Sequence, residues 1–286
     1  MNDQFKNLDF FQLESNIWLA EKKTHIPAYD FCFEPLFKVS RPRISGECPT
    51  VARIGAIDDY PNIYDSFIEY GYKLINNVDQ HKRASELEYW YPLIKAFTPK
   101  SVVYDTFPNL DEVLQELSFP IFIKGNRQSA KHDRSLSIAK DEEGFNRIKE
   151  QYPKNNILHW QKVVCREFVA LQQLKVKHES KVPLSFEFRT FWWYGECVGT
   201  GHYWSQHASY SWTEEQKSDA LAMVKKAIEK IDIPFLVVDL ALTKAGDWII
   251  IEFNDAQEAG YCGVQPIQLW HNITALNQSS SENLVI

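Results

Sequence analysis

Residues 235–254 read FLVVDLALTKAGDWIIIEFN, two apolar runs on either side of a short Gly-containing stretch. Runs rich in Val, Ile, Leu and Phe that flank such a stretch are typical of a β-hairpin. If the hairpin closes on Ala245 and Gly246, cross-strand partners have residue numbers with a constant sum. Asp239 is then predicted to lie directly opposite Glu252.

One face of this hairpin is predicted to be wholly apolar and to face a core. That face would carry Leu236, Val238, Leu240 and Leu242 on the first strand and Ile249, Ile251 and Phe253 on the second. The other face presents Asp239, Glu252 and, two residues further along, Asn254. Facing carboxylates with Cβ atoms about 4.5–5.5 Å apart repel each other, so a cation is expected between them.

Oxygen ligands on two rigid strands suit a hard cation such as Mg²⁺. A second interpretation is a pair of solvated carboxylates on the open face of an ordinary hairpin, one with a raised pKa that relieves the repulsion. A turn shifted by one residue would also move every side chain of a strand to the other face. The hairpin alone leaves these interpretations open.

Composition places the 286-residue chain among ordinary globular proteins, with 44% hydrophobic and 24% charged residues. The length predicts two or three subdomains. A net charge of −7 argues against a general nucleic-acid-binding protein. The five cysteines form no CxxC pair and no zinc-type spacing, which fits a reducing cytoplasm. No leader-like start and no apolar run of about 20 residues is present, so a cytoplasmic protein without a membrane span is expected.

The first half of the chain mixes short strands and helices. Residues 1–50 predict short strands and loops. The elements expected next are strands at 50–57, 72–76 and 101–105, and helices at 63–71, 78–97 and 109–117, with Asn109 as a helix N-cap.

Residues 119–140, FPIFIKGNRQSAKHDRSLSIAK, predict a strand, a polar loop and a second strand. Lys124 ends the first strand, and the loop contains Arg127, Lys131 and Arg134. The loop is either a solvated hairpin tip or a mobile flap whose amides and cations bind a polyphosphate. No GxxxxGK[ST] motif occurs, which argues against a Walker-type NTPase.

The second half predicts a helix at 142–150, a strand within 157–171 and a hairpin at 184–204 about Tyr194 and Gly195. Arg189 lies in mid-strand among aromatics and needs a partner, either an acid such as Glu187 or an anionic ligand. Thr213 and Gln216 form a capping box that opens an amphipathic helix. The tail after Leu276 is predicted to fray.

In this order the motifs resemble those of the ATP-grasp superfamily of ATP-dependent carboxylate ligases, in particular the branch found among phage-encoded and bacterial conflict-system proteins. The resemblance covers residues 72–264. It rests on YKLIN with the following helix, FPIFIKG as the strand of the phosphate-binding lysine, VVCREFVAL as the hinge strand, FEFRTFWW as the arginine strand, and VVDLAL with WIIIEFNDAQ as the metal-binding pair.

The resemblance implies a role for each matching residue. Lys124 would contact the α- and β-phosphates, and Lys82 or Arg83 could add a phosphate contact. Arg189 would bind the γ-phosphate and the developing acyl phosphate. The backbone of Glu167, Phe168 and Val169 would meet adenine, and Asp239, Glu252 and Asn254 would hold Mg²⁺, with Glu252 bridging two ions.

The resemblance also implies an α+β fold of the ATP-grasp type, in which two α/β subdomains sandwich ATP after a small N-terminal α/β segment. The expected parts are an N-terminal region at 1–98, a lid subdomain at 99–170 and a catalytic subdomain at 171–286. Two features depart from the family pattern. The loop after Gly125 contains no further glycine, and the only acid in the segment just after the hinge is Glu179.

The implied activity is an ATP- and Mg²⁺-dependent ligation of a carboxylate to an amine or similar nucleophile through an acyl phosphate. The substrates would be small molecules or peptides. Two alternatives stay open: a kinase or phosphotransferase of the same fold, and a module that binds ATP without ligation. Oligomeric state is not predicted. For the ligase, Glu252→Gln and Arg189→Ala are expected to abolish turnover in a folded protein.

Overall fold

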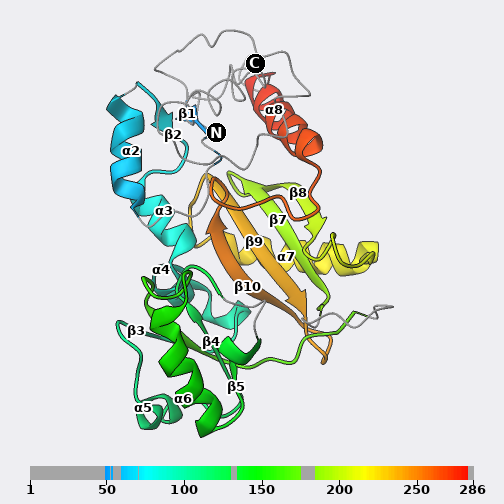
Figure 1. The fold of residues 1–286 in the computed structure, drawn as a ribbon. Helices are drawn as coiled ribbons and strands as arrows, with labels where there is room; N and C mark the ends of the chain where they lie inside the picture. Colours follow the sequence, from blue (N-terminus) through cyan, green and yellow to red (C-terminus); the bar gives the residue numbers. More distant parts are fainter. Residues whose placement is uncertain are drawn as a thin grey trace.

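The computed structural model describes residues 49–51, 53, 59–69, 71–129, 134–174 and 184–282. These residues form two four-stranded antiparallel sheets, a two-stranded parallel pair and the helices that cover them. The prediction for residues 1–48 lies outside the described residues. Figure 1 shows the larger sheet in the middle of the molecule and the smaller sheet with its helices below it.

The larger sheet is built from two hairpins in the order β10-β9-β7-β8. The first hairpin joins β7 (Glu187–Trp193) to β8 (Glu196–His202). Its turn residues Tyr194 and Gly195 have φ of 48° and 81°. Positive φ at both central residues is the requirement of a type I′ turn, so the predicted two-residue turn is confirmed.

The second hairpin joins β9 (Phe235–Leu242) to β10 (Trp248–Asp255) and differs from the prediction in its turn. Thr243 and Asp247 enclose a three-residue loop, with Gly246 at φ 98°. Leu240 therefore pairs with Ile250, but a β-bulge at Ile251 shifts the register by one residue. Beyond the bulge Asp239 pairs with Glu252, as predicted.

The bulge also corrects the predicted faces of β10. Ile250 is fully buried in the core with Leu240 and Phe253, whereas Ile249 and Ile251 lie on the opposite face and line a cavity. The prediction that Ile249 and Ile251 belong to the apolar core face was wrong. One extra residue in the strand exchanges the faces of its neighbours because side chains alternate with a period of two.

Helix α7 (Glu214–Ile228) covers one face of the large sheet and lies behind it in Figure 1. Its N-terminus carries the predicted capping box, in which Thr213 and Gln216 each accept a hydrogen bond from the other's backbone N–H. The buried stripe matches the predicted apolar positions Ala220, Val224, Ala227, Ile228 and Ile231. This packing fixes the back of the sheet and leaves the polar face of β9 and β10 turned the other way.

Helix α8 (Pro266–Glu282) packs on that other face, near the N-terminal end of β9. Leu269, Trp270 and Ile273 contact a cluster that includes Phe235 and Val237. The helix continues to Glu282, so the prediction of fraying directly after Leu276 was wrong. Because α8 covers only one end of this face, the middle stays open around Asp239 and Glu252.

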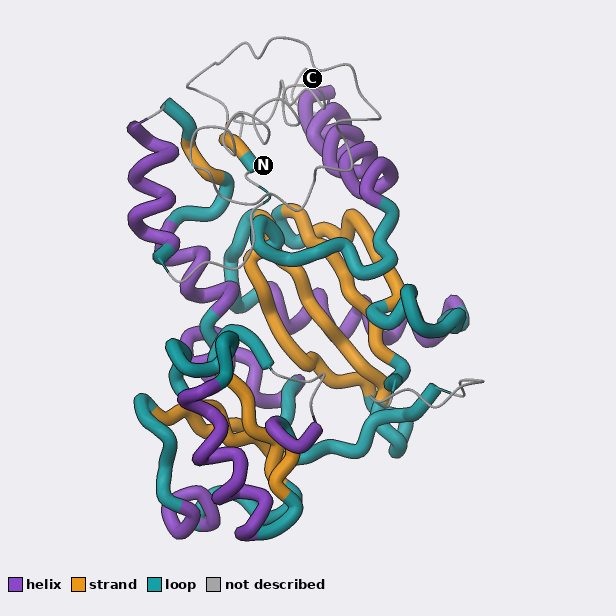
Figure 2. The backbone as a smooth tube through the Cα atoms, in the orientation of Figure 1, coloured by secondary structure: helices purple, strands orange, loops and turns teal. Residues whose placement is uncertain are grey.

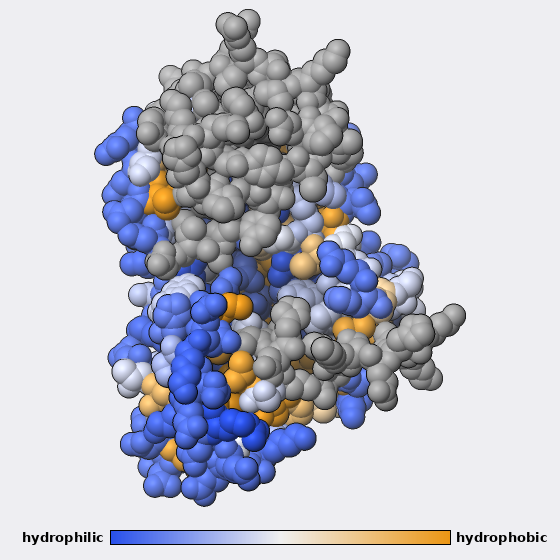
Figure 3. All heavy atoms as spheres, in the orientation of Figure 1, coloured by the Kyte–Doolittle hydropathy of each residue, from blue (hydrophilic) through white to orange (hydrophobic). Residues whose placement is uncertain are grey.

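The smaller sheet has the order β3-β6-β4-β5. Its strands are β3 (Ser101–Tyr104), β4 (Ile121–Gly125), β5 (Ile138–Ala139) and β6 (Val163–Glu167). Helix α6 (Glu142–Gln151) and the short α5 (Leu110–Leu114) pack on one face of it. The outer surface of α6 is hydrophilic in Figure 3. The opposite face of the sheet turns toward β10.

The segment before the small sheet consists of β1 (Pro49–Thr50), α2 (Tyr60–Glu69), β2 (Lys73–Leu74), α3 (Val78–Ser85) and α4 (Leu87–Ile94). One helix was predicted across residues 78–97, but Glu86 is extended and divides it. The backbone N–H of Leu87 donates to Asn126 O, a contact that fixes this break. Figure 2 shows these helices beside both sheets.

Helices and sheets alternate irregularly, so the predicted α+β class is confirmed. The subdomain boundaries at 98/99 and 170/171 stay predictions. Within the described ranges, no helix has both the length and the apolar character needed to cross a bilayer.

Candidate functional site

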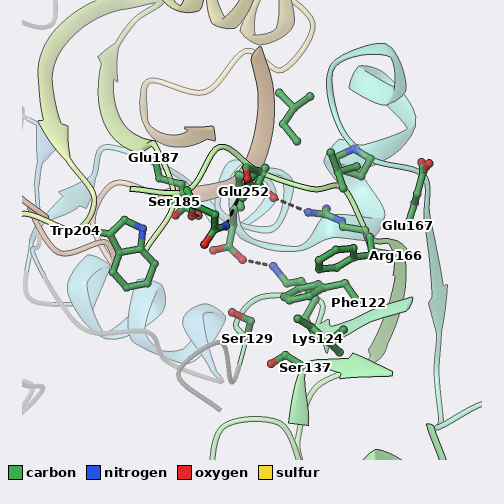
Figure 4. A pocket seen from close by; sticks show the side chains of 18 residues that line it. Phe122, Lys124, Ser129, Ser137, Arg166, Glu167, Ser185, Glu187, Trp204 and Glu252 are labelled. Carbon is green, nitrogen blue, oxygen red and sulfur yellow. Dashed lines mark hydrogen bonds and ion pairs between the residues drawn. The ribbon is translucent and has the colours of Figure 1, made fainter. Parts of the chain in front are cut away.

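A cavity lies between the small sheet and the polar face of β10 (Figure 4). The small sheet and its hinge contribute one wall, and the large sheet contributes the other. The lining residues are Pro99, Phe122, Lys124, Ser129, Ser137, Ile138, Arg166, Glu167, Phe168, Val169, Leu171, Gln173, Ser185, Glu187, Trp204, Ile249, Ile251 and Glu252. Five of the residues predicted for the site, Lys124, Glu167, Phe168, Val169 and Glu252, are therefore brought together.

Lys124 on β4 and Glu252 on β10 form an ion pair across this cavity (Figure 4). Their side chains are 4% and 15% exposed. A buried ammonium is stable only when it is paired, because removal from water penalises the charged form. Of the two predicted interpretations of the carboxylate pair, the solvated one is therefore wrong for Glu252.

Arg189 on β7 makes a bidentate ion pair with Asp239 on β9, its direct neighbour in the sheet. Nε and Nη2 of Arg189 donate to the two carboxylate oxygens at 2.8 and 2.7 Å, and Nη1 donates to Gly260 O at 2.7 Å. Burial acts to lower the pKa of Arg189, but the charge and hydrogen bonds of Asp239 outweigh it and raise that pKa. The partner of Arg189 is thus an acid, although Asp239 rather than Glu187.

Asn254 follows Glu252 on β10 beyond the bulge and pairs with Val237. The amide, Asp239 and Glu252 offer oxygen donors from two adjacent strands, the donor set that suits Mg²⁺. In the described part of the chain, no group of three or more His, Cys, Asp or Glu residues is placed to hold a metal ion. The assignment of Asp239, Glu252 and Asn254 as metal ligands stays a prediction.

The hinge strand β6 ends at Glu167, whose backbone N–H donates to Lys100 O. No backbone hydrogen bond within the described ranges involves Phe168 or Val169, and the Phe168 side chain is 39% exposed. The backbone N–H and C=O groups of these two residues are therefore available to a planar polar ligand. This is the part of the chain that the sequence assigns to adenine.

Arg166 precedes the hinge and was missed by the sequence analysis. Its side chain is buried, and Nε donates to Ser101 Oγ at 2.8 Å while Nη1 donates to Ile251 O at 2.7 Å. Burial lowers the pKa of Arg166 to about 10. The signal was available: Arg166 alternates with the buried Val164 on the face of β6 opposite Cys165.

Glu187 is a second missed residue of the cavity wall. It starts β7, is 6% exposed and accepts a hydrogen bond from the Ser185 hydroxyl. Gln173, which follows the hinge in sequence, lines the same cavity and forms a bridge with Ser185. The sequence analysis sought a ribose-binding acid directly after the hinge and found only Glu179, which lies outside the described residues. A carboxylate is instead supplied by the next strand.

The loop after β4 is anchored, not a solvated tip, at its described end. Gln161 Oε1 accepts the backbone N–H groups of Arg127 and Gln128 at 2.9 and 2.8 Å. The buried Arg127 guanidinium donates to both oxygens of Glu258 at 3.0 and 2.8 Å. Arg127 is therefore directed toward Glu258 and not toward the cavity, while Lys131 lies outside the described residues and the side chain of Arg134 is not described.

Arg127 and Glu258 belong to a buried polar network beside the cavity. Arg127 Nη2 also donates to Nε2 of His81 at 3.1 Å, and Nδ1 of His81 lies 3.1 Å from Asp255 Oδ2. Tyr60 stacks on His81 with ring centroids 3.7 Å apart. Burial raises the pKa of Glu258 although His81 and Arg127 oppose the shift. The network connects α2, α3, the loop after β4 and the end of β10.

The two basic residues considered on the preceding helix are not part of this cavity. Arg83 donates from Nη1 to Ile231 O at 3.0 Å, close to the end of α7. Neither Lys82 nor Arg83 is a lining residue. Their suggested phosphate contact therefore gains no support from the cavity.

Comparison with known proteins was made for sequence families, curated proteins and solved structures. A family model described as an ATP-grasp domain, the third family of its clade, matches residues 108–273, more than half of the chain. No curated protein matches. Apart from Lys82 and Arg83, the matched range contains every residue that the sequence analysis placed in the site.

Several solved structures are similar in fold. A RimK-domain ATP-grasp protein from Sphaerobacter thermophilus is 11% identical, with 93% of each chain covered and a TM-score of 0.57. A D-alanine–D-alanine ligase from Bacillus anthracis, solved with ATP, is 14% identical with a TM-score of 0.53 and 77% and 75% coverage of this chain and that one. An N5-carboxyaminoimidazole ribonucleotide synthetase from Thermotoga maritima is 14% identical with a TM-score of 0.52 and 85% and 66% coverage. At such identities the similarity establishes the fold.

Proposed function

Because the chain belongs to the ATP-grasp superfamily, in the family whose model matches residues 108–273, we propose that it binds ATP in the cavity between the two sheets and ligates a carboxylate to an amine. The observation that carries the proposal is the convergence of Lys124, the hinge at 167–169 and Glu252 on one cavity. These residues come from three separate strands. The similar ligases named above support the class of reaction.

The chain's own groups suit the parts of a nucleotide. The free backbone at Phe168 and Val169 takes the base, and Glu187 with Gln173 takes the ribose hydroxyls. Lys124 then meets the phosphates from β4. The base, ribose and phosphates would thus be read by the hinge, the start of β7 and the small sheet.

Ligation of this type begins when the substrate carboxylate attacks the γ-phosphate and forms an acyl phosphate and ADP. An amine then attacks the acyl carbon and releases phosphate. Two anions must approach each other in the first step, so the main task of the protein is to position and neutralise charge. Lys124 and Arg189 are the cations that perform it, and Asp239 holds the Arg189 guanidinium in one orientation.

The oxygen donors of Asp239, Glu252 and Asn254 fit Mg²⁺, and these residues would hold it. When bound, the metal would neutralise phosphate charge and orient the transferred group. Because Arg189 occupies Asp239 and Lys124 occupies Glu252, both carboxylates are held on the same face before a ligand arrives.

The substrates are proposed only by class, as a small-molecule or peptide carboxylate and an amine. The experiment is to incubate the protein with ATP, Mg²⁺ and pools of amino acids, short peptides and metabolite carboxylates, and to follow ADP and products by mass spectrometry. A new amide that requires both substrates supports ligation. A phosphorylated acceptor without an amide would instead identify a kinase.

One observation favours a second candidate, a module that binds ATP without ligation. Arg127, a cation of the loop after β4, is paired with the buried Glu258 and does not face the cavity. A loop without this cation and without further glycine offers fewer groups for closure over a phosphate. Nucleotide binding with slow ATP hydrolysis that no acceptor accelerates would support this candidate.

A further inference from the structure

The guanidinium of Arg166 has one nitrogen that the protein leaves without a hydrogen bond. Ser101 accepts from Nε and Ile251 from Nη1, but the buried Nη2 has no hydrogen-bond partner among the described residues. The Arg166 side chain is 4% exposed, so bulk water does not replace that partner. Figure 4 shows the side chain extending from the hinge strand into the cavity.

A second polar atom on this wall is in the same condition. The buried Ser137 Oγ, just before β5, has no hydrogen-bond partner in the part of the chain that the structure describes. Buried polar atoms without partners are rare in native proteins. Two of them on the wall of one cavity indicate that a ligand supplies what the protein lacks, and a guanidinium can only donate.

The position of Arg166 identifies which part of a nucleotide it meets. Arg166 directly precedes the hinge residues Glu167 and Phe168, and its partner across the β4–β6 ladder is Phe122, two residues before Lys124. Arg166 therefore lies between the segment assigned to the base and the lysine assigned to the phosphates. The purine edge that connects those two regions is the edge of the five-membered ring.

On that edge adenine presents one acceptor, N7, beside the N6 amino donor. Pyrimidine bases have no five-membered ring and no N7. Resting on the proposed nucleotide site, we propose that Nη2 of Arg166 donates a hydrogen bond to N7 and thereby selects purine nucleotides.

The two hydrogen bonds that hold Arg166 make it a suitable reading group. Ser101 on β3 and Ile251 on β10 fix the planar guanidinium from both sheets, so little side-chain entropy is lost when a base binds. With a pKa of about 10 the group stays protonated at neutral pH and can donate. The bulge at Ile251 turns that residue toward the cavity wall and brings its carbonyl to Arg166.

The test compares ATP with 7-deaza-ATP, in which a carbon replaces N7, by calorimetry on the full chain. The wild-type protein is expected to bind 7-deaza-ATP about tenfold more weakly, the effect of one hydrogen bond to a charged donor. Arg166→Met is expected to bind the two nucleotides equally. As a control, 3-deaza-ATP lacks an acceptor on the opposite edge, and its affinity relative to ATP should be the same in both proteins.

Equal binding of ATP and 7-deaza-ATP by the wild-type protein would overturn the inference and leave the proposed nucleotide site intact. A tenfold preference that persists in Arg166→Met would also overturn it, because another group would then read N7. Absence of binding by any of these nucleotides would refute the proposed function itself. If Arg166→Met does not fold by circular dichroism, Arg166→Leu takes its place.

Discussion

Asp239 lies directly opposite Glu252 in the β9–β10 ladder, and the two carboxylates pair with different cations. Arg189 holds Asp239 within the large sheet, while Lys124 reaches Glu252 from the small sheet. The second pair therefore connects the two walls of the cavity. A phosphate that binds Lys124 has to compete with Glu252, unless a metal ion takes over the carboxylate.

This competition predicts how Glu252→Gln behaves. The variant should bind the ATP analogue without dependence on Mg²⁺, because the neutral amide neither holds the metal nor competes strongly for Lys124. ATP turnover should fall by about 10²–10³, the effect of losing one preorganised charged group. Calorimetry with and without Mg²⁺ and an ADP-release assay measure both effects. Glu196→Gln changes an exposed acid that pairs with Lys225 and should behave as wild type.

Arg189→Ala is expected to weaken the fold as well as the activity. Removal of one partner of a buried ion pair leaves an uncompensated charge, which costs about 3–5 kcal/mol. The structure thus adds a loss of stability to the loss of turnover predicted from the sequence. The free energy of unfolding in urea measures it, and Arg189→Ala combined with Asp239→Ala should recover part of the loss. A variant as stable as the exposed-pair control Lys225→Ala would contradict the assigned role of this pair.

Gly125→Ala should disturb the loop after β4. A Cβ atom at this position would lie 2.1 Å from Gln161 Oε1 and 2.9 Å from Gln128 O. The methyl group therefore displaces Gln161, whose oxygen holds two backbone N–H groups of the loop. We expect a lower thermal midpoint and weaker nucleotide binding. Gly260→Ala is the matched control, since nothing lies within 4 Å of its Cβ and its φ is not positive; an equal effect of both changes would contradict the packing explanation.

His202 predicts a dependence of stability on pH. Partial burial against Phe188 and Tyr210 lowers its pKa below the ordinary value of 6.5. Between the two pKa values the unfolded chain binds more protons than the folded protein, so stability decreases as pH falls from 6.5 through the folded pKa. His202→Phe should make the free energy of unfolding less steep in pH over this range. The exposed His207 serves as the control site, and an unchanged slope in His202→Phe would refute the assignment.

The sequence predicted the pairing of the two carboxylates for a reason that was only half right. A two-residue turn would align Asp239 with Glu252, but the real turn has three residues and the bulge at Ile251 restores the alignment. Alternation of apolar residues cannot reveal a bulge inside the run Ile249–Ile251, because all three side chains are apolar. The faces of these isoleucines were therefore assigned wrongly while the acids were placed correctly.

The cavity wall shows a second limit of prediction from sequence. Lys124 and the hinge were found because each belongs to a recognisable strand motif. Arg166 and Glu187 were not, since their roles depend on contacts with Ile251 and Ser185 that are distant or irregular in sequence. The network of His81, Arg127 and Glu258 likewise joins residues more than 40 positions apart.

The most direct test of the nucleotide site is the thermal midpoint of unfolding with a non-hydrolysable ATP analogue, measured with and without Mg²⁺. A ligand at about 100 times its Kd stabilises the native state by about 2.7 kcal/mol. We predict a clear increase with Mg²⁺ in the wild-type protein and a much smaller one in Lys124→Met, which lacks the phosphate-binding cation. No increase at millimolar analogue, or the same increase in Lys124→Met, would contradict the assignment of this cavity to ATP.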